Sequence, residues 1–385
     1  MQLIQKPLIV GMVAGEKSGD ILGSGLISAL KGMYSNITFV GIAGSLMQRN
    51  GCNSWYNMDE LSLLGIFEII THLPRLLRIR SELFKRFIAT KINIFIGIDA
   101  PEFNIELEYR LKSKGIKTIH YVSPSIWAWR SNRIFKIKNA TNLVLLLWPF
   151  EKKIYQKYNV KHSYIGHNMA DKFLLFPNKK RSRKLLKINY NVICLSILPG
   201  SRLSEINMLT IIFLRTAQIL IDDFPRLKIL VPIINKTLRN RFESIYKNNF
   251  PELSLDILDG MYANHAMIAS DITLLASGTA TLECMLAKCP MVVGYKMNKF
   301  TFWLLEKIAN ISFISLPNLL ANTELVKEYI QTRCQPQLLA NALKFLLINK
   351  MKVKYLKKEF TKLHKIIRCN ADKKAAKEIL KLIKY

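Results

Sequence analysis

The segment IFIGIDAPEFN, residues 94–104, decides how the chain must fold. It begins with an unbroken apolar run, which is typical of a strand buried on both faces. The run ends abruptly at a carboxylate, Asp99, and Pro101 follows two residues later. Because proline restricts the backbone, the segment predicts a rigid strand that holds an acid at its tip.

Similar apolar runs recur along the chain and alternate with longer amphipathic segments. This alternation predicts an α/β protein with parallel sheets. The runs form two groups, and the polar, basic segment 175–191 separates them as a linker would. The runs lie at residues 8–15, 92–98, 118–122 and 142–148 in the first group, and at 192–200, 227–232, 253–258, 272–277 and 291–295 in the second.

Each group predicts one Rossmann-like, doubly wound domain, residues 1–176 and 177–350. In open sheets of this kind, ligands bind beyond the carboxyl ends of the strands. We therefore expect two domains that face a cleft. Residues 351–385 carry an apolar helical face that we expect to pack on a domain, formed by Leu356, Phe360, Leu363 and Ile367.

Composition limits the class of protein. The 385 residues carry a formal charge of +30, which would attract nucleic acid or an anionic membrane, or could reflect compositional drift towards lysine. No recognised nucleic-acid motif is present. The six cysteines are scattered and form no zinc pattern, and they fit a reducing compartment. No apolar stretch reaches the length of a spanning helix, so we expect a soluble or peripheral protein.

Two acids follow first-domain strands. In GEKSGD, residues 15–20, Gly15 and Gly19 permit a tight turn, and Ser18 and Asp20 are best interpreted as helix caps. Glu16 has little use as a cap there. We expect Glu16 and Asp99 to lie at adjacent strand ends and to face the cleft.

The second domain has two candidate phosphate cradles, each between a strand and a helix. One contains Ser201 and Arg202, and the other contains Ser277, Gly278 and Thr279. Backbone N–H groups at a helix start favour anions, although an Arg202–Glu205 pair would explain the first turn equally simply. Glu283, one helical turn after Thr279, could accept the ribose hydroxyls, so the pair of cradles favours a nucleoside diphosphate.

Segment 61–87 combines apolar residues at helical spacing with a cluster of arginines. Two interpretations explain this segment equally well. It could form two core-facing helices that Pro74 interrupts, or it could be one interfacial membrane element. Trp127 could line an acyl groove, although packing is the usual role of Trp. His120 is by default a hydrogen-bonded core residue. The candidate acyl contacts are Ile66, Ile69, Ile70, Leu73, Leu77 and Trp127.

Taken together, the motifs resemble those of the lipid A disaccharide synthases, which are inverting glycosyltransferases. The resemblance covers nearly the whole chain and is specific as a set. Small departures are Lys17, Glu102 in place of Asp, and Asn168 in place of Thr. The motifs are GEKSGD (15–20), GIDAPEFN (97–104), HYVSPSIWAWR (120–130), IGHNMAD (165–171), ILPGSR (197–202), LLASGTATLECMLAKCPMVVGY (274–295), SLPNLL (315–320) and RCNAD (368–372).

The resemblance implies a GT-B fold whose last helices cross back to the N-terminal domain. It implies condensation of UDP-2,3-diacylglucosamine with 2,3-diacylglucosamine 1-phosphate (lipid X) to the β-1,6 disaccharide 1-phosphate and UDP. It implies no metal and no other cofactor, and cytoplasmic, peripheral attachment to the inner face of the cytoplasmic membrane. Asn318 enters the nucleotide site by resemblance alone.

Within that reaction we expect Asp99 to be the base, with Glu16 as second choice or as an orienting group. Two alternatives remain open from the residues themselves: a related peptidoglycan sugar transferase, and a nucleic-acid-binding protein suggested by charge alone. The sequence does not determine the oligomeric state, and a homodimer remains an open alternative.

Overall fold

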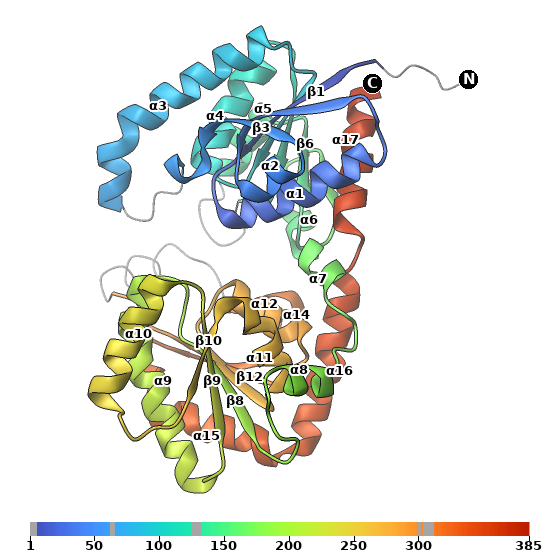
Figure 1. The fold of residues 1–385 in the computed structure, drawn as a ribbon. Coiled ribbons are helices and arrows are strands. Elements are labelled where there is room, and N and C mark those ends of the chain that lie inside the picture. The colour runs from blue at the N-terminus through green and yellow to red at the C-terminus, as the bar shows by residue number, and fades with distance from the viewer. Residues whose placement is uncertain are drawn as a thin grey trace. The chain divides into compact units, whose positions relative to one another are not determined.

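A computed structural model describes residues 6–61, 66–124, 126, 132–298, 302 and 312–384, without the side chains of residues 66–72 and 384. The chain divides into two compact units (Figure 1). The first comprises Met1–Asp171 and Ile367–Tyr385, and the second comprises Lys172–Ile366. Each unit is built on a parallel sheet, as the sequence predicts.

The first unit contains a seven-stranded sheet in the order β3-β2-β1-β4-β5-β6-β7. Its strands are β1 (Leu8–Ala14), β2 (Ile37–Ala43), β3 (Cys52–Asn57), β4 (Ile94–Ile98), β5 (Lys117–Tyr121), β6 (Leu143–Leu146) and β7 (His162–Tyr164). Its helices are α1 (Lys17–Lys31), α2 (Ser45–Arg49), α3 (Ile66–Ala89), α4 (Pro101–Lys112), α5 (Arg133–Ala140), α6 (Lys152–Lys157), α7 (Asn168–Lys172), which ends at the unit boundary, and α17 (Ala371–Lys384).

The second unit contains a six-stranded sheet in the order β10-β9-β8-β11-β12-β13. Its strands are β8 (Cys194–Leu198), β9 (Lys228–Ile233), β10 (Asp256–Asp259), β11 (Ile272–Leu275), β12 (Met291–Tyr295) and β13 (Lys327–Ile330). Its helices are α8 (Lys179–Leu185), α9 (Leu203–Asp223), α10 (Lys236–Asn249), α11 (Ala263–Ala269), α12 (Thr279–Leu286), α14 (Leu316–Ala321), α15 (Pro336–Ile348) and α16 (Lys350–Ile367).

Each sheet has one place where the strand order reverses direction. In the first sheet it lies between β1 and β4, where Ala14 pairs with Ile98. In the second it lies between β8 and β11, where Leu198 pairs with Leu275. Ligands of open α/β sheets bind at such switch points. The loops that carry Glu16, Asp99, Ser201 and Ser277 follow these four strands.

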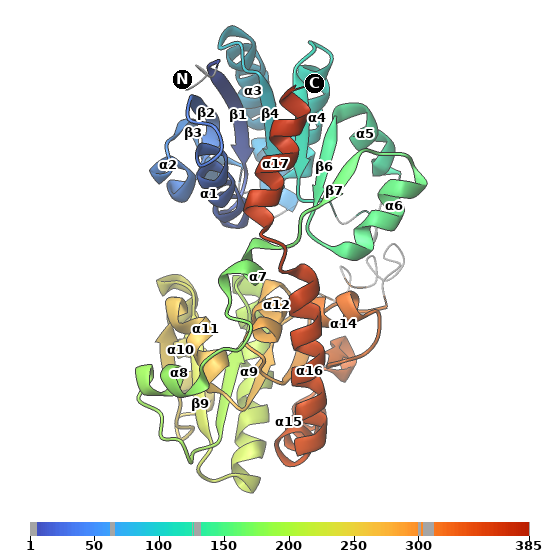
Figure 2. The same cartoon turned by 90° about the vertical axis from the view of Figure 1, so that its right-hand side faces the viewer.

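The C-terminal helices divide between the two units. The predicted apolar face of α16 is buried, but the contacts assign residues up to Ile366 to the second unit. Helix α17 packs on α1 of the first unit (Figure 2), where Ala375, Ala376 and Ile379 are fully buried. The predicted boundaries at residues 176 and 350 therefore differ from the observed ones, because α17 crosses back and α16 does not.

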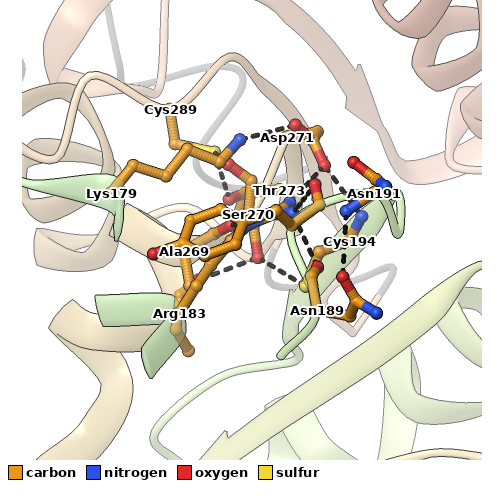
Figure 3. A network of polar contacts seen from close by, with 12 residues as sticks. Lys179, Arg183, Asn189, Asn191, Cys194, Ala269, Ser270, Asp271, Thr273 and Cys289 are labelled. Carbon is orange, nitrogen blue, oxygen red and sulfur yellow. Dashed lines mark hydrogen bonds and ion pairs between the residues drawn. The ribbon is translucent and has the colours of Figure 1, made fainter. Parts of the chain in front are cut away.

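The segment predicted as a linker, 175–191, is instead docked on the second unit through α8. Arg183 is almost fully buried, and it donates to the carbonyl of Ala269 and to the carboxylate of Asp271. The same carboxylate accepts from Lys179 Nζ at 2.5 Å and from the Cys194 N–H at 2.9 Å (Figure 3). The basic composition of this segment thus provides buried contacts rather than flexibility.

Helix α9 is long and apolar enough to pass a test for a membrane span, and half of its most apolar window is buried in the described structure. Residues Leu209, Phe213, Leu214 and Leu220 of α9 are at most 1 % exposed. Core helices of globular proteins pass the same test, so α9 is best explained as a core helix of the second unit.

Candidate functional site

Asp99 stands at the tip of β4 in a conformation that the surrounding structure holds in place. Both Asp99 and Ala100 have left-handed backbones, with φ of 53° and 43°. Each such residue costs about 1–2 kcal/mol. The Asp99 N–H donates to the Tyr121 carbonyl, and the Asn104 amide donates to the Asp99 carbonyl, both at 2.8 Å. Pro101 then begins α4, so the left-handed pair turns the chain sharply after the strand.

The protonation of Asp99 depends on a buried neighbour. Burial raises the pKa of Asp99 above its ordinary value, and the charge of His120 partly opposes this. His120 is fully buried on β5, and its Nδ1 lies 2.7 Å from Oε1 of the equally buried Glu108. Burial lowers the pKa of His120, but Glu108 and Asp99 outweigh it and leave the pKa above its usual range.

His120 is thus the hydrogen-bonded core residue that the sequence suggests by default, whereas the sequence does not predict its partner Glu108. The glycine at position 97 makes room for the Glu108 carboxylate, because a Cβ at Gly97 would lie 2.2 Å from Glu108 Oε1. The pair places an ionisable group beside the strand tip that carries Asp99.

Glu16 lies at the tip of β1, beside the Asp99 loop. It precedes α1, is exposed and makes no side-chain capping bond. A Cβ on Gly15 would lie 2.7 Å from Cβ of Ala100, so the two loops pack closely. The switch point therefore brings the two predicted acids to neighbouring loops.

Two other acids of these loops have structural partners. Asp20 does not cap its own helix but accepts from the N–H groups of Leu46 and Met47, both at 2.9 Å, at the start of α2. Glu102 is largely exposed and forms an ion pair with Arg133. Because Asp20 and Glu102 serve these structural contacts, Asp99 and Glu16 remain the candidate reactive acids of the two loops.

The first predicted cradle of the second unit is partly occupied by its own chain. Glu205 accepts from the N–H of Ser201 at 2.8 Å and from that of Arg202 at 3.2 Å. Gly200, with φ of 131°, must be glycine because a Cβ would lie 2.4 Å from Glu205. The Ser201 N–H, which we expect to be free for a phosphate, is therefore already bonded to Glu205. The side chains of Ser201 and Arg202 are exposed.

The second cradle is open. Gly278 has a φ of 148°, and among the described residues no atom lies within 4 Å of the place that a Cβ would take there. Ser277 Oγ donates to the Ile314 carbonyl at 2.7 Å, and Thr279 begins α12. The loop therefore leaves space above the first turn of α12.

Glu283 lies one turn further along α12. Burial raises the pKa of Glu283 to about 7. Within the described part of the chain, no hydrogen bond or ion pair to its carboxylate is found. A half-buried, unpaired carboxylate beside an open loop suits a ligand that donates hydrogen bonds.

Asn318 does not fit the predicted direct contact with a nucleotide. Its amide group donates to the Val326 carbonyl and to Glu328, and its oxygen accepts from the N–H groups of Leu325 and Val326. All four positions are used, and the residue is fully buried. Glu328 also accepts from the Ser315 N–H, so Asn318 and Glu328 hold in place the segment that supports Ser277.

The predicted acyl contacts other than Trp127 fall on α3, which is one continuous helix with Pro74 inside it. Leu73 and Leu77 are 46 % and 45 % exposed, whereas Leu83 and Phe87 further along are fully buried. The segment is therefore one helix and not two, and Leu73 and Leu77 do not face the core, whereas Ile79 of the same helix is buried. The side chains of Ile66, Ile69 and Ile70, and all of Trp127, lie outside the described residues.

Within the described residues, no group of three or more His, Cys, Asp or Glu side chains could hold a metal ion. The candidate residues are therefore strand-tip carboxylates in the first unit and, separately, two strand-to-helix loops followed by an acid in the second.

Comparison with known proteins identifies relatives over nearly the whole chain. The family model described as lipid-A-disaccharide synthetase matches residues 10–379. Lipid-A-disaccharide synthases of Yersinia pestis and Shigella flexneri are each 55 % identical over 98 % of this chain, covering 95 % and 99 % of their own lengths.

The chain belongs to the lipid-A-disaccharide synthase family. It is a glycosyltransferase of lipid A biosynthesis.

Solved structures confirm the fold class. A UDP-GlcNAc 2-epimerase from Neisseria meningitidis, solved with UDP-GlcNAc, matches with a TM-score of 0.62 at 14 % identity and covers 98 % of this chain and 100 % of its own. A kitacinnamycin glycotransferase matches with a TM-score of 0.65 at 13 % identity, over 98 % and 99 % of the two chains. The enzyme thus has the two-domain α/β GT-B fold.

Proposed function

We propose that the enzyme transfers 2,3-diacylglucosamine from its UDP derivative to O6 of 2,3-diacylglucosamine 1-phosphate. A bond forms between O6 and the anomeric carbon, and the bond from that carbon to the UDP phosphate breaks on the opposite side. The products are UDP and the β-1,6-linked disaccharide 1-phosphate. The observation that carries this proposal is the Asp99 carboxylate, held at a switch point by a left-handed turn.

Asp99 acts as the general base in this proposal. It takes the O6 proton as the new bond forms, which requires reach of about 3 Å directly or through one water. Its raised pKa improves it as a base near neutral pH, because its proton affinity is higher than that of an exposed aspartate. Glu16, on the adjacent loop, orients the acceptor sugar or replaces Asp99 as base.

The second unit binds UDP. The open loop at Ser277–Thr279 accepts one phosphate, and the Arg202 guanidinium pairs with phosphate oxygens as charge builds on the leaving group. Glu283 accepts the ribose hydroxyls. Binding at Ser201 requires Glu205 to release its N–H, so this cradle would form together with the ligand.

Attachment to the inner face of the cytoplasmic membrane is part of the proposal. Leu73 and Leu77 present apolar surface on α3. Nearby, Arg75 pairs with Glu60, and the Arg78 side chain, paired with Glu82, is 81 % exposed. Exposed leucine beside arginine suits the boundary between acyl chains and phosphates.

Turnover of the purified enzyme tests the proposal. We expect UDP and the disaccharide 1-phosphate to form in equal amounts from the two acylated sugars, as measured by mass spectrometry. A lipid-linked muramyl acceptor serves as the control and should give no product. Release of UDP at the same rate without any acceptor would contradict the proposal.

A further inference from the structure

A pocket of about 960 Å³ lies in the second unit, away from the proposed nucleotide loops. Ser270 and Cys289 line it, and they precede β11 and β12. The nucleotide loops follow the opposite, carboxyl ends of strands β8 and β11. The pocket is therefore at the amino edge of the sheet, where the proposed transfer reaction has no use for it.

Six of the fifteen residues that line this pocket are lysines, and none of the described residues that line it is Asp or Glu. Two of the lysines have acidic partners outside the lining: Lys179 with Asp271 at 2.5 Å, and Lys362 with Glu359 at 3.7 Å. The six are Lys179, Lys288, Lys357, Lys358, Lys362 and Lys365.

Four of the lysines come from α16, on a face that repeats with helical spacing. Lys357, Lys358 and Lys365 are exposed, and the described structure gives none of them a carboxylate within ion-pair distance. An exposed lysine row is often a solvated face, but this one faces Lys179 and Lys288 across a hollow. Several ammonium groups that converge on one concave space attract multivalent anions.

One of the lining lysines, Lys288, is in contact with a second basic group that lies behind the lining. Lys288 follows α12 in a left-handed conformation, with φ of 59°. Its Nζ lies 2.7 Å from Nδ1 of His364, which is fully buried on α16. Burial lowers the pKa of Lys288 to about 7. None of the described lining residues is an acid that could neutralise Lys288. A bound anion would compensate its charge.

Apolar side chains complete the wall. Phe176 and Ile366 line the pocket and are 76 % and 43 % exposed. Figure 3 shows that Lys179 and Cys289, which also line it, belong to the polar network that anchors α8. The wall is therefore fixed by the fold on one side and apolar at its rim.

We propose that this pocket binds a phosphate-bearing ligand, with the α16 lysines and Lys288 contacting the phosphate. The inference is independent of the proposed transfer reaction. The same chemistry is offered by a free phosphate compound and by the headgroup of an anionic lipid whose hydrocarbon part would meet Phe176.

A charge-matched pair of variants on α16 tests the proposal. The pocket variant is Lys357→Ala with Lys365→Ala, and the control is Lys350→Ala with Lys354→Ala, which removes the same charge outside the pocket. Alanine favours helix, so both should fold. The probe is inorganic pyrophosphate, titrated by calorimetry. UDP affinity and sugar transfer are measured in parallel and should stay unchanged in both variants, which separates this test from the proposed function.

We expect the pocket variant to bind pyrophosphate at least about tenfold more weakly than the control. A second arm measures flotation with phosphatidylglycerol vesicles. Weaker flotation of the pocket variant, together with displacement of the control by pyrophosphate, identifies the lipid headgroup as the source. Equal flotation with a loss in calorimetry identifies a free phosphate compound. Equal behaviour of both variants in both arms overturns the proposal.

Discussion

At the scale of single residues, the candidate site contains carboxylates whose surroundings differ. The sequence predicts an acid at the tip of β4 because an apolar run ends there. It does not predict that Asp99 and Ala100 are both left-handed, because neither residue type demands that conformation. The hydrogen bonds from Asn104 and to Tyr121 determine it, and they come from other elements.

The pH dependence of turnover should change when the charge of His120 is removed, because that charge lowers the pKa of Asp99. Asp99 must lose its proton to act as a base, so kcat/KM should rise with pH through its pKa. The His120 charge lowers that pKa, and His120→Gln should therefore move the acid limb up by about 1 pH unit. His162→Gln is the control, because His162 is half-buried and bonded to the Val160 carbonyl. An unshifted limb in His120→Gln would contradict the coupling.

Binding of UDP should depend on the ionisation of Glu283. With the pKa of Glu283 raised to about 7, the carboxylate that accepts ribose hydroxyls predominates at pH 8 and not at pH 6. We expect tighter UDP binding at pH 8. Glu283→Gln should bind about tenfold more weakly and lose this part of the pH dependence. Calorimetry at both pH values checks this, and identical curves for the variant and the parent would exclude the ribose contact.

At the scale of elements, the sequence predicts the buried strands well except for the inner strand β2, which no predicted run covers, and it predicts the edge strands poorly. β1, β4, β8 and β12 are continuous apolar runs and lie where predicted. β3, β7, β10 and β13 are the edge strands, and all but β10 were missed because their half-buried residues do not form such runs. The error over 175–191 has the same origin, since Arg183 is buried by its partners and not by its hydrophobicity.

The anchor of α8 predicts a difference in stability. Asp271→Ala leaves the buried Arg183 cation without its carboxylate, and we expect a loss of about 3 kcal/mol in the free energy of unfolding. Asp256→Ala removes a more exposed pair with Lys228 and should cost less than about 1 kcal/mol. Chemical denaturation measures both. Equal losses would show that the α8 network is not a buried anchor.

The exposed leucines of α3 predict a separation of membrane binding from stability. Leu73→Ser with Leu77→Ser removes apolar surface that already faces solvent, so vesicle binding should fall several-fold while the melting temperature stays unchanged. Leu83→Ser, at a fully buried position of the same helix, should lower the melting temperature instead. Early melting of the double variant would assign the two leucines to the core.

At the scale of the whole molecule, the alternation of runs predicts two α/β units, and the structure has them. The sequence does not show where α16 and α17 pack, since both are lysine-rich amphipathic helices. Local contacts decide: α17 buries small residues on α1, and Asp171 accepts from the N–H groups of Asn370 and Ala371 at its start. Asn318 shows the same limit, because its partners Leu325, Val326 and Glu328 lie outside the SLPNLL motif that contains it.

In the proposed enzyme the first unit supplies the base and the second binds UDP, and turnover of Asp99→Asn tests this division of roles. The variant keeps the size of the side chain but cannot accept the O6 proton. We predict that kcat falls by about 10²–10⁴-fold, while the affinity for UDP measured by calorimetry stays within twofold of the parent enzyme. Turnover close to that of the parent, or a loss of UDP affinity that accounts for the lost rate, would contradict the claim.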